Sequence, residues 1–566
     1  MRWPRGIAVP SAALLLVACT ASPALAQSAL PQSALPQSAL PQSALPQWAS
    51  VARMVYIGSE AAERARLQQL TDTASDTAPD PTFLFRSASS LSRRVERNRR
   101  VELSLIAPEL RTVYNSAIPN SPNNGALWAG RGTSSLATAG VRLHVGRVRV
   151  IVAPEITTSE NRPFQVIPYP QGGAAARRVW ANPFHPSPSS IDLPYRFGDQ
   201  QRQRTTAGQS SVSVDVPWLT TGVATENLWW GPGTNNAIVL SNNAEGFPHA
   251  FVQTRDGIDT PIGRFDAQWI TGVLRESDFF DRDSTNNRRT ISGVIAVWTP
   301  VFDRRLSIGA ARTVTAPVTG RSLDPTAAVD VFTRVGQPNT KADYVAIGAR
   351  PDQLLSVFGR FVFPGAGAEA YVEWARFAEP TSVRDLIEYP GHSQGYTVGL
   401  QWSRAVPRMG TFRLATEATQ LEPDASIRVR PVATSYTSRA MPQGYTHRGQ
   451  VLGAAIGPGS SSQALSADLF GARFRVGGFG GRIRWDNATL WEPIVPQVKL
   501  EDISLLGGVR ASVTLRGVRL LAEYTATARL DYLYQDKVTD YARGTHGGVD
   551  IDNRTLSVSL STHVGR

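Results

Sequence analysis

Apolar and polar residues alternate along most of the chain after about residue 125. Across Val518–Tyr534, every even position holds Val, Leu, Ala or Tyr, and the residues between them are mostly polar, Arg519 and Glu523 included. A period of two places successive side chains on opposite faces of a β-strand. This run is long enough for two barrel strands or one very long strand. Similar runs begin at Val141, Ala370 and Leu556.

This alternation indicates that strands, and not helices, cross a membrane. No run of 18 apolar residues follows the first 26 residues, which excludes membrane-spanning helices. At roughly 20–25 residues for a strand and its connection, residues 126–566 predict a mainly β protein, an antiparallel outer-membrane β-barrel of about 18 strands. A soluble β-sandwich or propeller would alternate in the same way. The length without a repeat of propeller period favours the barrel.

The first 26 residues read as a signal peptide. Arg2 and Arg5 precede an apolar stretch, and small residues at Ala24 and Ala26 form a cleavage site. Export to the outer membrane is therefore predicted. Leu16-Val17-Ala18-Cys19 also has the form of a lipoprotein box, and lipidation of Cys19 is the alternative to cleavage after Ala26. Cys19 is the only cysteine, so a chain cleaved after Ala26 has no disulfide and no cysteine-based metal site.

Two short regions separate this signal peptide from the predicted barrel. Residues 27–50 contain four copies of Ser-Ala-Leu-Pro-Gln, and proline in every unit predicts an extended linker. Residues 51–125 predict a small helical periplasmic segment. Its clearest helix lies at Ser59–Gln69, where a capping serine precedes strong helix formers. A further short helical turn is predicted at Pro108–Tyr114.

The chain carries a formal net charge of +12, which favours an acidic partner. Export argues against nucleic acid and leaves lipid phosphate or an acidic polysaccharide. Arginine greatly outnumbers lysine, and its planar guanidinium suits contacts to phosphate and carboxylate. A compositional bias of the genome is the alternative explanation for this arginine content.

Recognisable catalytic motifs are absent from the sequence. It contains no His-Glu-x-x-His motif and no Gly-x-Ser-x-Gly elbow. The seven histidines are scattered, and no pair has the spacing of metal ligands. We therefore predict a protein that is not an enzyme, with no catalytic residues, no metal site and no cofactor. A barrel enzyme acting on lipid or glycan is the least favoured interpretation.

Two stretches stand out as candidate sugar-binding segments. In Glu226–Phe251, Trp229 and Trp230 precede Gly-Pro-Gly, and an Asn-rich strand with Asn242 and Asn243 follows. Aromatic rings stack on the apolar face of a sugar, and amides bond its hydroxyls. The alternative is a packing cluster inside the protein or a girdle of tryptophans at the membrane interface.

The second stretch, Gln443–Gly457, is rich in glycine and carries Tyr445, His447 and Arg448. Glycines at four of its positions permit bends and a close approach of the backbone. A third stretch, Gly125–Gly132, contains Trp128 and Gly-Arg-Gly at the point where the alternation begins. These two stretches supplement the tryptophan pair as candidate functional motifs.

These three stretches, in this order, resemble the capsule assembly Wzi family. The specific match is Trp-Trp-Gly-Pro-Gly at Trp229–Gly233, followed by Ser-Asn-Asn-Ala at Ser241–Ala244 and Phe-Pro at Phe247–Pro248. Trp128 with Gly130–Gly132, and Gly444–Gly453, support it. The resemblance covers roughly residues 80–566. It implies an 18-stranded outer-membrane barrel with a helical periplasmic part, a lectin-like role in holding capsular polysaccharide, and no enzymatic activity.

The leading hypothesis is therefore an outer-membrane protein that binds capsular or extracellular polysaccharide at the cell surface. The alternative is a porin or selective channel, because an 18-stranded barrel can enclose water. We expect contacts with outer-membrane lipids and lipopolysaccharide, and a monomer. The residues proposed to bind polysaccharide, or to form motifs that hold the barrel together, are Trp229, Trp230, Asn242, Asn243, Tyr445, His447 and Arg448.

Overall fold

The computed structural model describes most of the chain after residue 48. The described residues are 49–52, 57–71, 83–93, 101–166, 182, 184–185, 190–281, 283–318, 325–333, 351–378, 383–424, 426, 433–439, 441–491, 501–534 and 549–562. The predicted signal peptide with Cys19, and the predicted linker up to residue 48, lie outside these ranges. Residues 47–566 form one compact unit.

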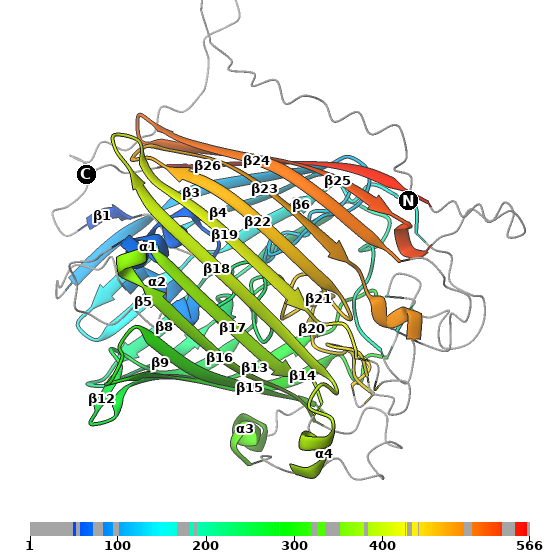
Figure 1. Cartoon of the computed structure of the whole chain (residues 1–566), viewed down its shortest axis with the longest axis horizontal. Coiled ribbons are helices and arrows are strands. Elements are labelled where there is room, and N and C mark those ends of the chain that lie inside the picture. The colour runs from blue at the N-terminus through cyan, green and yellow to red at the C-terminus, as the bar shows by residue number, and fades with distance from the viewer. Residues whose placement is uncertain are drawn as a thin grey trace, which may run out of the picture. The chain divides into compact units, whose positions relative to one another are not determined.

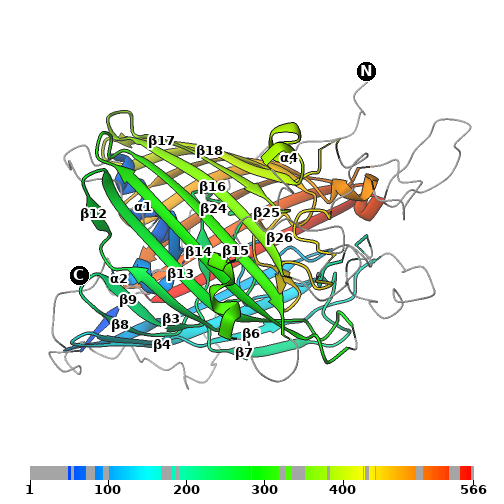
Figure 2. The ribbon, with the colours of Figure 1, turned by 90° about the horizontal axis from the view of Figure 1, so that it is seen from below.

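Antiparallel strands in sequence order form a closed barrel of 18 strands (Figures 1 and 2). The last strand, β26, pairs with the first, β3, through Leu560↔Leu110, which closes the wall. Three wall strands are each broken into two pieces, namely β5 with β6, β7 with β8, and β11 with β12. The predicted barrel of about 18 strands is confirmed.

The described elements have the following bounds. The first half of the wall comprises β3 (Val101–Asn115), β4 (Gly132–Val145), β5 (Val148–Val152), β6 (Glu155–Ser159), β7 (Arg202–Thr206), β8 (Ser211–Asp215), β9 (Leu219–Ala224), β11 (His249–Thr254), β12 (Ile258–Thr260), β13 (Gly263–Arg275), β14 (Arg288–Pro300) and β15 (Leu306–Pro317). The second half comprises β16 (Asp352–Phe363), β17 (Ala368–Arg376), β18 (Gln394–Val406), β19 (Gly410–Gln420), β22 (Ser461–Phe470), β23 (Phe474–Arg484), β24 (Ile503–Leu515), β25 (Val518–Leu530) and β26 (Ile551–Thr562). The other elements are β1 (Ala49–Ala52), β2 (Phe85–Ser87), β10 (Leu228–Trp230), β20 (Thr446–His447), β21 (Gln450–Val451), the helices α1 (Glu60–Thr71), α2 (Ala88–Arg93), α3 (Asp330–Thr333) and α4 (Val383–Glu388), and four short 3-10 helices, η4 (Pro325–Val329), η6 (Pro364–Ala366), η8 (Asn487–Trp491) and η9 (Tyr532–Tyr534).

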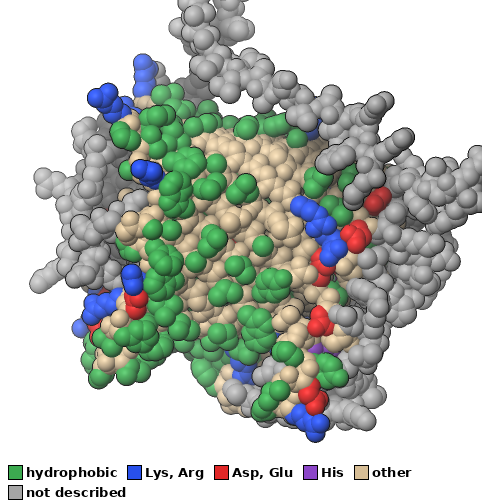
Figure 3. Space-filling view, in the orientation of Figure 1, with side chains coloured by type: hydrophobic (Ala, Val, Ile, Leu, Met, Phe, Trp, Pro, Cys, Tyr) green, Lys and Arg blue, Asp and Glu red, His purple; other side chains and the backbone are tan. Residues whose placement is uncertain are grey.

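The wall is apolar on the outside and polar on the inside. On β18, Val398 and Leu400 are 42% and 55% exposed, whereas Thr397 and Gln401, which alternate with them, are buried. This inverts the arrangement of a soluble β-protein and is typical of a barrel in lipid. Figure 3 shows hydrophobic side chains over the outer face of the strands, with charged side chains gathered toward the strand ends.

The two ends of the barrel have different connections. At one end the strands are joined by short turns, such as residues 146–147, 301–305 and 516–517. At the other end the connections are long, and they include residues 160–201, 225–248, 276–287 and 421–460. Outer-membrane barrels carry short turns on the periplasmic side and long loops on the cell surface, so the long connections mark the extracellular end.

The barrel begins earlier in the chain than the sequence predicted. Residues 51–125 were expected to be a helical segment, but β3 within this range is a complete wall strand paired with β4 and β26. The register of β3 against β4 shifts between Ile106 and Glu109. Proline is tolerated in a strand at such a bulge, which is why Pro108 does not end the strand. The short helical turn predicted at Pro108–Tyr114 is therefore wrong.

The helix predicted at Ser59–Gln69 is confirmed as α1, and it lies inside the barrel at the periplasmic end. It contacts well-separated strands of the wall. Arg66 pairs with Glu369 of β17 at 2.7 Å, and Glu60 pairs with Arg519 of β25. Wall strands surround α1 in both Figure 1 and Figure 2. Among the described residues, no helix is both long and apolar enough to cross a bilayer.

Candidate functional site

The Trp-Trp-Gly-Pro-Gly segment folds into the barrel lumen. Trp230 is fully buried in the largest hydrophobic cluster, and its indole N–H donates to Gln268 Oε1 of β13 at 2.9 Å. Trp229 is 3% exposed, and its indole N–H donates to the carbonyl of Gly233 at 3.1 Å. The guanidinium of Arg86 lies 4.9 Å from the Trp229 ring centroid. Both tryptophans are therefore packed within the protein.

A wall carboxylate holds the turn that follows these tryptophans. Glu417 of β19 accepts backbone N–H bonds from Thr234 at 2.6 Å and Asn236 at 2.8 Å. It also accepts the hydroxyl of Tyr371 at 2.7 Å. Hydrogen bonds to a charged acceptor are stronger than those between neutral groups, so this carboxylate fixes the segment against the wall.

The second predicted stretch packs against the first inside the lumen. Asn243 donates its side-chain N–H to the carbonyl of Val451 at 2.9 Å, and Asn242 accepts the N–H of Gly125 on its backbone carbonyl at 2.7 Å. Tyr445 is buried and stacks on Tyr436 with ring centroids 6.0 Å apart. The three motif stretches that lie far apart in the sequence thus meet in one interior structure.

His447 connects this structure to a group of charged residues. Its Nδ1 accepts the backbone N–H of Arg275 at 3.0 Å, so the proton of the neutral ring lies on Nε2, which is 3.5 Å from Glu245 Oε1. Arg204 and Arg448 each form an ion pair with Glu245 at 2.7 Å. Burial alone would raise the pKa of Glu245, but the His447 hydrogen bond and the two arginines lower it to about 2. The carboxylate stays ionised at neutral pH.

A cavity of about 390 Å³ adjoins this group at the extracellular end. It is lined by the start of β7 and the residues before it, by the residues after β13, and by Arg448. The lining side chains are Phe197, Asp199, Gln200, Gln201, Arg202, Gln203, Arg204, Glu276, Ser277, Asp278, Phe279 and Arg448, together with the backbone of Gly198. The volume lies near the lower end of the roughly 300–1,000 Å³ typical of small-molecule sites.

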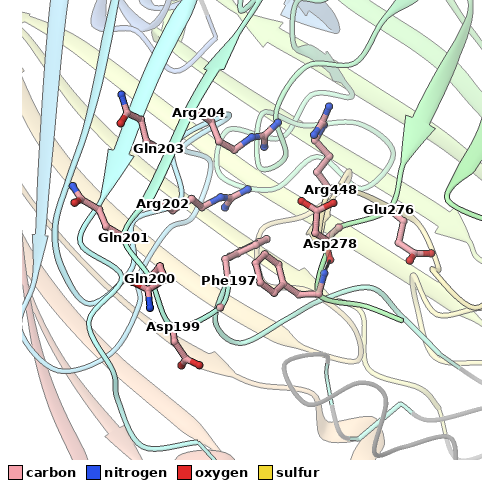
Figure 4. Close-up of a pocket in the computed structure, with 13 residues that line it drawn as sticks. Phe197, Asp199, Gln200, Gln201, Arg202, Gln203, Arg204, Glu276, Asp278 and Arg448 are labelled. Carbon is pink, nitrogen blue, oxygen red and sulfur yellow. Dashed lines mark hydrogen bonds between the residues drawn. The ribbon is translucent and has the colours of Figure 1, made fainter. Parts of the chain in front are cut away.

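Alternation along β7 turns the arginines of this strand into the barrel. Gln201 and Gln203 are exposed, whereas Arg202 and Arg204 are half-buried. Figure 4 shows the two arginines pointing toward Arg448 and the two glutamines pointing away from it. The cavity therefore presents three guanidinium groups, and Phe197 beneath them is 3% exposed.

The seven residues predicted from the sequence are brought into one continuous interior structure, but most do not line the cavity. Only Arg448 is among its lining residues. The others are engaged in packing and hydrogen bonds within the protein, which is the alternative that sequence analysis had left open. Sequence reasoning missed Phe197, Arg202, Arg204 and Glu245. The Gln-Arg-Gln-Arg pattern at 201–204 was the available signal, since it places two arginines on one face of a strand.

Within the part of the chain that the structure describes, no group of three or more His, Asp or Glu side chains is placed to hold a metal ion.

Comparison with known structures places the fold among large outer-membrane barrels. The chain is similar to Wzi of Escherichia coli, described as an outer-membrane protein involved in group 1 capsule assembly and as a carbohydrate-binding β-barrel, with a TM-score of 0.52 and 12% identity over 85% of this chain and 88% of that one. A BenF-like porin of Pseudomonas fluorescens aligns with a TM-score of 0.37 and 8% identity, over 82% of this chain and 99% of the porin. No curated protein sequence matches the chain.

The sequence also matches a family model over residues 123–470, and that model describes the capsule assembly protein Wzi. The match covers more than half of the chain, and it includes the tryptophan segment and the Gln443–Gly457 segment. Together with the apolar outer wall, it identifies an outer-membrane protein. The chain belongs to the capsule assembly protein Wzi family.

Proposed function

We propose that this protein binds capsular or extracellular polysaccharide and holds it at the cell surface, without catalysing a reaction. The observation that carries the proposal is the cavity at the extracellular end, where arginines and aromatic rings converge in a barrel of the Wzi family. Rings and hydrogen-bonding groups together suit recognition of a sugar.

The filled interior supports a binding role over a channel. The segments at 226–248 and 441–457 pack together inside the barrel, and α1 lies across the periplasmic end. An 18-stranded barrel conducts when its lumen holds water. We expect the purified protein to show no steady open pore in planar bilayers, and a stable conductance would favour the porin alternative.

Deletion of the gene tests the proposal in cells. Polysaccharide is measured separately in the fraction attached to washed cells and in the medium. We expect the attached fraction to fall and the released fraction to rise, with the total unchanged, because the proposed role is to hold the finished polymer and not to make it. Unchanged attachment in the deletion strain would contradict the proposed function.

A further inference from the structure

The three cavity arginines are not equally neutralised by the protein. Arg204 and Arg448 share a single carboxylate, Glu245. Among the described residues, Arg202 has no carboxylate within ion-pair distance, and its Nη1 is buried without a hydrogen-bond partner. Arg202 is half-buried, and partial burial of a cation without a carboxylate partner costs free energy. An anionic ligand at the exposed part of the guanidinium would offset this cost.

The geometry of Arg202 suits a planar anion. Its guanidinium carbon lies 3.9 Å from the centroid of the Phe197 ring. The Phe197 ring is held in turn by edge contacts to Trp128 at 4.8 Å and Phe279 at 5.9 Å. Stacking uses the face of a guanidinium and leaves the N–H groups at its edge free to bond a carboxylate with two parallel hydrogen bonds.

The carboxyl groups around the cavity do not balance the charge of its three arginines. Asp199 is paired with Arg196 at 2.8 Å. Glu276 accepts a hydrogen bond from Gln443 at 2.6 Å, and burial, together with nearby carboxylates, raises its pKa to about 8, so it is uncharged at neutral pH. Asp278 is exposed. Three arginines therefore face the ionised carboxylate of Glu245 and the exposed side chain of Asp278.

We propose that this cavity binds a carboxylated sugar residue of the polysaccharide, with the carboxylate on Arg202 and Arg448 and the ring against Phe279. The inference rests on the proposed function and adds the chemical class of the ligand. Glu245 serves as a positioning residue, because its ion pairs with Arg204 and Arg448 fix the orientation of both guanidinium groups. A neutral polymer would supply no counter-charge to the guanidinium of Arg202.

Binding of purified protein to two forms of one polymer tests this proposal. The probe is the extracellular polysaccharide isolated from cells that make the protein, used either native or after chemical reduction of its carboxyl groups to alcohols. We expect the native polymer to bind at least tenfold more tightly. Arg202→Gln and Arg448→Gln are each expected to weaken native binding at least tenfold, while Arg202→Lys, which keeps the charge but loses the planar fork, falls between them and the wild type.

The matched control is Arg384→Gln. Arg384 is an exposed arginine of α4 at the same end of the barrel and outside the cavity, paired with Glu388, and its loss is expected to leave binding unchanged. Migration of the folded barrel before and after heating on denaturing gels checks that each variant folds.

The possible outcomes separate the two proposals. If the wild type binds neither form of the polymer, the proposed function itself fails. If it binds both forms equally, or if the folded cavity variants bind like the wild type, the carboxylate site is overturned and the proposed function stands. Loss of binding in the variants without any effect of carboxyl reduction would assign the arginines to another anion, such as phosphate, and would also overturn this proposal.

Discussion

Two arginine-rich regions inside the same barrel differ in how their charge is balanced. Around α1, four arginines lie within ion-pair distance of buried carboxylates. Arg66 and Arg360 pair with Glu369, and Arg413 and Arg510 pair with Asp468. At the extracellular cavity, Arg202 faces an aromatic ring and open space. The difference is that these arginines at the periplasmic end are neutralised by carboxylates of the protein, whereas Arg202 at the extracellular end is not.

The largest effect is expected at the α1 region. Glu369→Gln removes the carboxylate that Arg66, Arg360 and Gln401 share. Two buried guanidinium groups would then lack their counter-charge, and we expect a loss of about 3–5 kcal/mol in the free energy of unfolding. Denaturant unfolding in micelles measures it, with Glu388→Gln at an exposed ion pair as the control. Equal stability of the two variants would show that the α1 region is not held by these pairs.

A smaller effect on stability is expected at the tryptophan pair. Trp230→Phe keeps an aromatic ring but leaves Gln268 Oε1 without its indole donor, which costs about 1–3 kcal/mol. Because Trp230 is fully buried, polysaccharide binding by the folded variant should equal that of the wild type. Weakened binding at unchanged stability would instead support the prediction from the sequence that the Trp230 ring stacks on a sugar.

The smallest effect is expected from pH at the cavity. Glu276 faces Gln443, Asp192, Asp281 and Arg289. Its pKa is raised from the usual 4.5 to about 8. The folded protein therefore favours the neutral form of Glu276, and this contribution to the free energy of unfolding is fully present below pH 4.5 and is lost as the pH rises through 8.

Between pH 7 and 9, ionisation of Glu276 adds a negative charge to the cavity. We expect native polysaccharide to bind a few-fold more weakly at pH 9 than at pH 7. Asp192, whose pKa is raised to about 6 by burial, is already ionised in this window. Glu276→Gln should remove the pH dependence. Its persistence in that variant would assign it to another group.

Most of the wall and the helix α1 could be predicted from the sequence, but the contacts inside the barrel could not. Alternation on strands such as β18 and β25 follows directly from the lipid outside and the polar lumen inside. β3 was missed because its bulge changes the phase of alternation beside Pro108. The pairing of Arg66 with Glu369 joins residues 303 positions apart, and no local pattern specifies such a contact.

The predicted motif residues also show that a local sequence pattern does not specify the contacts of a side chain. Trp229, Trp230 and Asn243 were recognisable as unusual, but a local motif does not reveal whether a ring faces a ligand or the interior. The structure shows their partners within the protein. Arg202 drew no attention in the sequence, because its stacking partner and its missing counter-charge become visible only when β7 and the residues before it are folded.

Retention of polysaccharide on intact cells tests the central claim most directly. A deletion strain is complemented with the wild type, with the double variant Arg202→Gln/Arg448→Gln, or with Arg384→Gln, and the barrel is confirmed as folded in each outer membrane. We predict that the wild type and Arg384→Gln restore attached polysaccharide, whereas the double variant releases it into the medium. Full retention by the folded double variant would contradict the account.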